Sequence, residues 1–128
     1  MSQFIVGNTR TYAAGGSINA NKVVRLGASD NTVHHNTSST TPNTGTSMHS
    51  ASSGENVTVQ LDGTAKLVAN AQLTRNAIVK ADTNGGIRTT TTGNDSVVGV
   101  VLESTTQTVT ESGTEVVEVD LSCRNSRY

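Results

Sequence analysis

The sequence predicts an all-β fold, a single small β-sandwich or barrel-like domain with an N-terminal arm and a long polar loop. Thr and Val are the commonest of the 128 residues, and helix formers are scarce outside 65–77. The run 97–102 is short, β-branched and bounded by polar residues, which is typical of a strand buried on both faces. The segments 57–61 and 115–121 alternate apolar and polar residues, as strands with one face in water do. Together these three strands predict the core of the domain.

The composition limits how that core is built. The length is that of one domain, the hydrophobic fraction is 33%, and the aromatic residues are Phe4, Tyr12 and Tyr128. The core must therefore consist of Val, Ile, Leu and Ala, which form thin layers. We expect such a domain to gain stability from a partner or from identical subunits.

The N-terminal residues 1–13 are predicted to form either a first strand or a docking arm, and residues 14–128 the β-domain. Phe4, Ile5 and Val6 are apolar and precede a Gly7-Asn8 turn signal. An apolar end segment suits both interpretations, because it is buried either in the chain's own core or on a neighbour.

Two stretches resemble each other, residues 15–26 and residues 70–81. In each, an apolar residue stands five positions before a β-branched pair, which a basic residue follows. Each stretch continues through a turn into a short strand candidate, 32–34 or 87–89, so each is predicted to form a strand–turn–strand unit. The second turn carries the Asn-Gly signal of a tight hairpin. The likeness has two interpretations, duplication of one unit and convergence of two hairpins.

Residues 35–54 are predicted to be a long exposed loop that moves freely or is ordered by contact. They are almost entirely Asn, Thr, Ser and Gly, and they contain the single proline, Pro42. Such a segment has little apolar surface to offset its ordering entropy. Residues 103–115 are predicted to form a hairpin around Ser112-Gly113, and the tail 122–128 to lie on the surface.

The charges favour no nucleic-acid or membrane partner. Nine basic and ten acidic residues are scattered along the chain, with no basic stripe and no row of stacking aromatics. No run approaches transmembrane length, and no signal peptide is recognisable, so we expect a soluble protein made in a reducing cytoplasm. Cys123 is the single cysteine and is expected to be a free thiol.

The sequence offers no pattern for a metal, a cofactor or an enzyme. His34 and His35 would point to opposite faces of a strand, and with His49 they are expected to be solvated. A calcium-like opening at 82–86 lacks the turn glycine and the closing glutamate. Glu118 and Asp120 share a strand face, which we interpret as the wet side of the strand rather than as an acid–base pair.

The second half of the chain has an opening strand, a glycine-marked hairpin, a valine-glycine-valine strand and a closing valine-glutamate-valine strand: 57–61, 63–67, 73–80, 84–86, 97–103 and 116–119. The order of these segments resembles the small head decoration, or cement, proteins of tailed bacteriophages. The resemblance covers about half of the chain.

The resemblance implies a non-enzymatic protein that binds the outer surface of an assembled capsid, as a homotrimer, and bridges adjacent major capsid proteins. It implies a place on the virion after synthesis in the bacterial host. We expect the capsid contacts on the apolar N-terminal arm, at Phe4, Ile5, Val6 and Tyr12. The alternative is an adhesive or carbohydrate-binding fibre module, which the scarcity of aromatic platforms disfavours.

Overall fold

The computed structural model describes residues 7–91, 93–106, 115–122 and 124–126. These residues form ten strands and one 3₁₀ turn, so the predicted all-β class is confirmed. The elements are β1 (Thr9–Ala14), β2 (Val23–Leu26), β3 (Thr32–His35), β4 (Gly45–Ser47), β5 (Asn56–Gln60), β6 (Thr64–Val68), β7 (Ile78–Ala81), η1 (Thr83–Gly85), β8 (Ile87–Thr89), β9 (Val97–Val101) and β10 (Val116–Asp120). The 3₁₀ turn is the one helix among the described residues and is far too short to cross a membrane.

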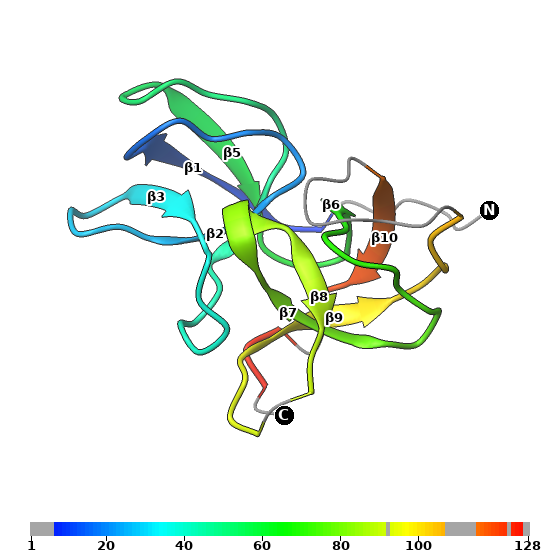
Figure 1. Ribbon diagram of the computed structural model, residues 1–128. Helices are drawn as coiled ribbons and strands as arrows, with labels where there is room; N and C mark the ends of the chain where they lie inside the picture. Colours follow the sequence, from blue (N-terminus) through cyan, green and yellow to red (C-terminus); the bar gives the residue numbers. More distant parts are fainter. Residues whose placement is uncertain (1–6, 92, 107–114, 123, 127–128) are drawn as a thin grey trace.

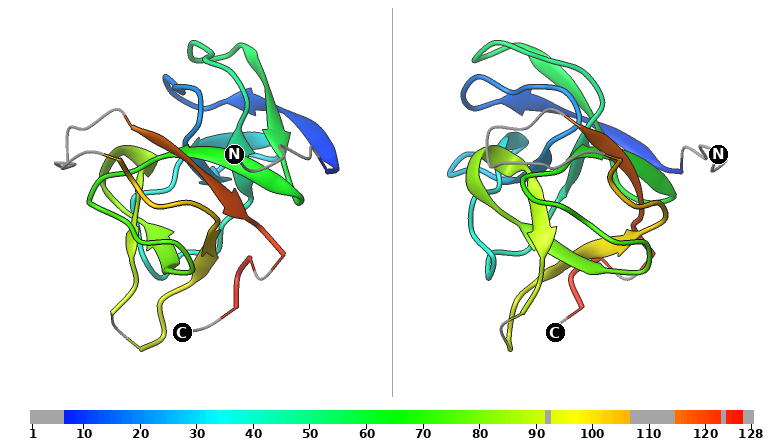
Figure 2. Two further views of the ribbon diagram at one scale, coloured as in Figure 1. Left: turned by 90° about the vertical axis from the view of Figure 1, so that its right-hand side faces the viewer. Right: turned by 45° about the vertical axis from the view of Figure 1, so that its right-hand side comes forward.

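The strands form two five-stranded sheets (Figure 1). The first has the order β1-β3-β2-β4-β5 and closes into a barrel where β5 pairs with β1. The second has the order β6-β10-β9-β7-β8, and a parallel bridge between Ala69 and Ile87 links its two ends. Both views of Figure 2 place β1 and β5 above β8 and β9.

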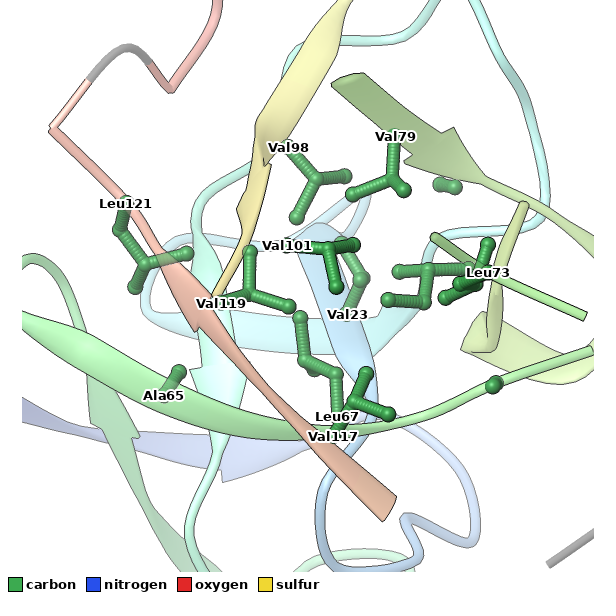
Figure 3. Packing of buried hydrophobic residues seen from close by; sticks show 13 residues of the cluster. Val23, Ala65, Leu67, Leu73, Val79, Val98, Val101, Val117, Val119 and Leu121 are labelled. Atoms are coloured by element: carbon green, nitrogen blue, oxygen red, sulfur yellow. The ribbon is translucent and has the colours of Figure 1, made fainter. Parts of the chain in front are cut away.

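Each sheet encloses its own apolar cluster, built from small and branched side chains as the composition predicts. The residues buried in the first sheet are Tyr12, Ala14, Ile18, Val24, Val33, Ala51, Val57 and Val59. Val23 of β2 points out of the first sheet and belongs to the cluster of the second, where it lies among Leu67, Leu73, Val101 and Val119 (Figure 3). The two halves of the chain therefore share apolar contacts.

The second sheet repeats the first, strand for strand. β1 pairs with β5 as β6 pairs with β10, and β2 pairs with β3 and β4 as β7 pairs with β8 and β9. The two strand–turn–strand units predicted from 15–26 and 70–81 are the hairpins β2–β3 and β7–β8. Because the equivalence extends to all five strands of each half, it favours duplication over convergence.

Individual residues obey the same equivalence. Gly45 pairs with Val24 as Gly99 pairs with Val79. A Cβ atom on Gly45 would lie 2.3 Å from the carbonyl oxygen of Gln60, and one on Gly99 would lie 2.3 Å from that of Asp120. These two glycines therefore allow the same close approach of two strands in each half.

The three strands predicted as the core are present. β9 has four of its five residues buried, as expected of a strand without a wet face. β5 and β10 cover most of 57–61 and 115–121, and their valines at 57, 59, 117 and 119 are buried. The turn of the predicted hairpin 103–115 lies outside the described residues.

The prediction of one exposed loop at 35–54 is wrong for its first part, whereas residues 48–50 and 52–54 are exposed. Residue 35 ends β3, residues 45–47 form β4, and the side chains of Asn36, Asn43, Thr46 and Ser47 are buried. The Nδ2 of Asn36 donates to the Oδ1 of Asn43 at 2.7 Å, and the Nδ2 of Asn43 donates to the carbonyl oxygen of Val97 at 3.3 Å. Polar side chains are buried here because hydrogen bonds replace their contacts with water.

Candidate docking surface

An open groove lies beside the first barrel. One hollow of about 550 Å³ is lined by Tyr12, Leu26, Pro42, Leu61 and Arg124, among others. A second hollow of about 370 Å³ shares Tyr12 and Leu26 and extends over Arg10 and the turn 27–31. We call the two together the Tyr12–Leu26 groove. Its lining combines apolar side chains with two arginines, which is the composition of a protein-binding surface.

Leu26 is the main exposed apolar side chain of the groove. It ends β2 and is 56% exposed, whereas its counterpart in the second half, Ala81, is buried. Exposed apolar area is ordinary when it is scattered, but here it stands over an open groove next to Leu61. Covering Leu26 by a partner would remove it from water.

Tyr12 forms the wall of the groove rather than a free ring. It lies in β1 opposite Val57 of β5, is 6% exposed and belongs to the first apolar cluster. The guanidinium of Arg10 lies 5.1 Å from the ring centroid and donates to the Oδ1 of Asn31 at 3.1 Å. The predicted contact residue Tyr12 is thus present at the groove, mostly covered by its own chain.

The C-terminal segment fixes the opposite wall. Arg124 donates from its Nε to the carbonyl oxygen of Leu61 at 3.0 Å, and from its guanidinium to that of Asn43. Asn125 donates from its Nδ2 to the same oxygen of Asn43 at 2.9 Å. These bonds hold Pro42 and Asn43 beside Leu61, so the groove is preformed.

The N-terminal segment begins at the rim of this groove. The backbone nitrogen of Leu61 donates to the carbonyl oxygen of Asn8 at 2.8 Å, and that of Asn8 donates to a carboxylate oxygen of Asp62 at 2.6 Å. The other predicted contact residues, Phe4, Ile5 and Val6, precede this anchor and lie outside the described residues. Sequence reasoning missed Leu26 and Leu61, because only the fold brings them beside Tyr12.

Of the histidines expected to be solvated, His49 is exposed and His34 and His35 are half-buried, and two of the three accept hydrogen bonds from backbone nitrogens. The Nε2 of His35 accepts from the nitrogen of Asn19 at 3.0 Å, and the Nε2 of His49 accepts from that of Thr58 at 3.1 Å. His34 lies against Gly15, where a Cβ would come within 2.4 Å of its ring. Among the residues that the structure describes, no three metal-binding side chains gather.

His35 should make stability depend on pH. Burial lowers the pKa of His35, and the nearby charges of Lys22 and His34 lower it further. A lowered pKa favours the neutral ring in the folded state, so stability is complete above about pH 6.5 and falls as the pH drops toward the folded pKa. We expect the melting temperature to decrease as the pH falls below about 6.5.

The control for this prediction is His35→Gln, whose side-chain oxygen can still accept from Asn19. It should flatten the pH dependence that begins below about pH 6.5 without removing the losses caused by carboxylates in more acidic solution. Those come from carboxylates such as Asp95, whose pKa is lowered by the hydroxyl of Thr90 and by Lys80. An unchanged slope in the variant would refute the role of His35.

Glu118 corrects another expectation. It was predicted to lie on the wet side of its strand with Asp120, but its side chain is 7% exposed and its Oε2 is buried. Asp120 is half-buried and accepts from the backbone nitrogen of Ser122 at 2.9 Å. The two carboxylates therefore have different surroundings and form no pair.

Comparison with known proteins assigns the family. The family model described as phage cement protein matches residues 6–120. Among solved structures, the N base of the head fibre protein gp8.5 of bacteriophage phi29 is similar, with a TM-score of 0.72 and 13% identity. That alignment covers 94% of this chain and 98% of the phi29 chain, and at such identity it shows the fold alone. No individual curated protein matches in sequence. Because the family model spans most of the sequence and the fold agrees with it, the chain belongs to the phage cement protein family.

Proposed function

We propose that this protein binds the outer surface of an assembled phage capsid and stabilises it by bridging adjacent major capsid proteins. Its family membership already gives it a capsid-associated structural role in a non-enzymatic class. The observation that carries the finer proposal is the preformed Tyr12–Leu26 groove beside the start of the apolar N-terminal segment. We propose that the groove and the apolar N-terminal segment both contact the capsid.

We propose that the capsid is contacted by two sets of residues. The first is Phe4, Ile5 and Val6 of the arm, and the second is Tyr12 and Leu26 of the groove. Burying apolar side chains contributes roughly 1.5–3 kcal/mol for each one fully removed from water. Leu26 is 56% exposed, so much of this contribution is still to be gained on docking. Tyr12 supports the groove wall and contributes little new buried area of its own.

The mechanism is thermodynamic linkage. A protein that binds the assembled lattice and not its dissociated subunits stabilises the lattice by its free energy of binding. Repetition over many equivalent sites multiplies this contribution. We propose that the protein acts as a homotrimer on the outer capsid surface, after synthesis in the host cytoplasm, since a thin aliphatic core benefits from subunit contacts.

Capsid binding should depend on both parts of the contact region. We expect deletion of residues 2–6 and, separately, Leu26→Asp to weaken binding at least about tenfold, the equivalent of about 1.4 kcal/mol. The deletion stops before Asn8, so it spares the bonds that anchor β1. The measurement is co-sedimentation with undecorated capsids, after light scattering of the free protein.

Met48→Asp is the matched control. Met48 is 36% exposed and lies away from the groove, so the same change of charge there should leave binding unaltered. Full binding by both the deletion variant and Leu26→Asp would refute this contact region. A protein that ignores the capsid in every form would refute the capsid role itself.

The alternative of a carbohydrate-binding module gains no support from the described residues. A sugar platform needs an accessible aromatic face, and the ring of Tyr12 is buried and faced by Arg10.

A further inference from the structure

The second half of the chain carries a different hollow, outside its apolar cluster. It measures about 380 Å³ and is lined by Lys66, Glu103, Val116, Val117 and Glu118. Val116 starts β10, whereas Arg124 of the Tyr12–Leu26 groove follows the end of that strand. The hollow and the groove therefore lie toward opposite ends of β10.

Glu118 is the unusual member of this hollow. Its side chain is 93% buried, and its Oε2 has no hydrogen-bond partner. Lys66 is its direct neighbour across the β6–β10 pair, yet this oxygen is unbonded. Buried polar atoms are almost always bonded, because leaving one without a partner costs free energy. A buried oxygen without a hydrogen-bond partner, on a side chain that lines a hollow, is typical of a site that binds another molecule.

The lining defines the chemistry of that partner. The lining holds two carboxylates, Glu103 and Glu118, and one ammonium group, Lys66, so its formal charge is negative. Val116 is 37% exposed and Val117 is buried, which makes the wall apolar. An apolar wall with carboxylates suits a side chain that has an aliphatic stem and a cationic head.

We propose that this hollow receives an arginine side chain of the capsid protein, with the guanidinium paired with the carboxylates of Glu103 and Glu118. Arginine fits better than lysine because its planar group presents several donors to carboxylates and sheds water more easily. The inference rests on the proposed function, in which the partner is the capsid. It adds a second contact on the other half of the chain, which a bridging protein requires.

The first test is Glu118→Gln with undecorated capsids. The change keeps the shape and removes the charge, so we expect capsid binding to weaken at least about tenfold. The melting temperature should stay the same or rise, because a neutral amide replaces a buried carboxylate whose Oε2 has no hydrogen-bond partner. Glu55→Gln is the matched control: this exposed side chain on the first half accepts from Ser52, and glutamine can do the same.

The second test does not depend on the capsid. N-acetyl-arginine methylamide, titrated at millimolar concentration, should shift the backbone amide NMR signals of Lys66, Glu103 and Glu118. Its neutral isostere, N-acetyl-citrulline methylamide, should not, and Glu118→Gln should lose the response. Equal shifts with both probes, or equal capsid binding by wild type and Glu118→Gln, would overturn the proposal. If wild type fails to bind capsids but responds to arginine, the hollow stands and the proposed function fails.

Discussion

Alanine at Gly99 is expected to destabilise the domain by about 3 kcal/mol, at the upper end of what overpacking costs. Gly99 lies in β9 where this strand approaches β10. A Cβ there would lie 2.3 Å from the carbonyl oxygen of Asp120 and 2.6 Å from the Cγ1 of Val119. The first contact is with backbone, which cannot rotate away, so the two strands would have to separate.

The other half of the fold has an equivalent glycine, Gly45, at which the same experiment can be done. Gly45→Ala should cost a similar free energy, because its Cβ would lie 2.3 Å from the carbonyl oxygen of Gln60. Gly93→Ala is the control, since nothing lies within 4 Å of the Cβ it would add. The measurement is the free energy of unfolding in urea. If Gly99→Ala unfolds at the same urea concentration as Gly93→Ala, the close approach has no energetic importance.

Local patterns were sufficient to predict the strands and the repeated hairpins. The alternation in 57–61 and the apolar run 97–102 record which faces are buried, and burial of a strand face is a local property of the sequence. The likeness of 15–26 to 70–81 is visible for the same reason. This likeness predicts two equivalent hairpins, and in the structure the equivalence includes all five strands of each half.

The polar interior could not be read in this way. In the sequence, Asn36 and Asn43 look like loop residues because they are polar. Their burial depends on hydrogen bonds that only the fold creates. The nitrogen of Asn43 donates to the Oδ1 of Asn125 at 2.6 Å, a partner 82 positions away. Hydropathy gives no sign of such a pairing. Glu118 was misplaced for a related reason: alternation predicts which face a residue shares but not what covers that face.

Part of the candidate docking surface stands out in the sequence. The apolar arm and Tyr12 stand out in a chain with few aromatics, and the fold does bring Tyr12 to an open groove. Leu26 and Leu61 carry no mark in the sequence that separates them from core residues. Leu26 is exposed at the end of β2, and Leu61 is half-buried directly after the end of β5.

The buried asparagines lead to the second large effect. Asn43→Ala should destabilise the protein by about 2 kcal/mol, because it removes the acceptor of Asn36 and the donor to Val97 from a buried site. The backbone bonds of residue 43 to Arg124 and Asn125 would remain. The loss in free energy of unfolding should therefore measure the contribution of the side-chain hydrogen bonds that join the two halves. Urea unfolding measures it directly.

A double-mutant cycle separates this network from simple loss of packing. Asn36→Ala removes the other side chain of this hydrogen-bonded pair, and the double variant removes both side chains at once. Because each single change takes one hydrogen bond from the remaining buried amide, the double variant should cost less than the two singles added, by about 1 kcal/mol. Additive costs would mean that the two amides contribute independently. In that case the bond between Asn36 and Asn43 would not account for the burial of these two side chains.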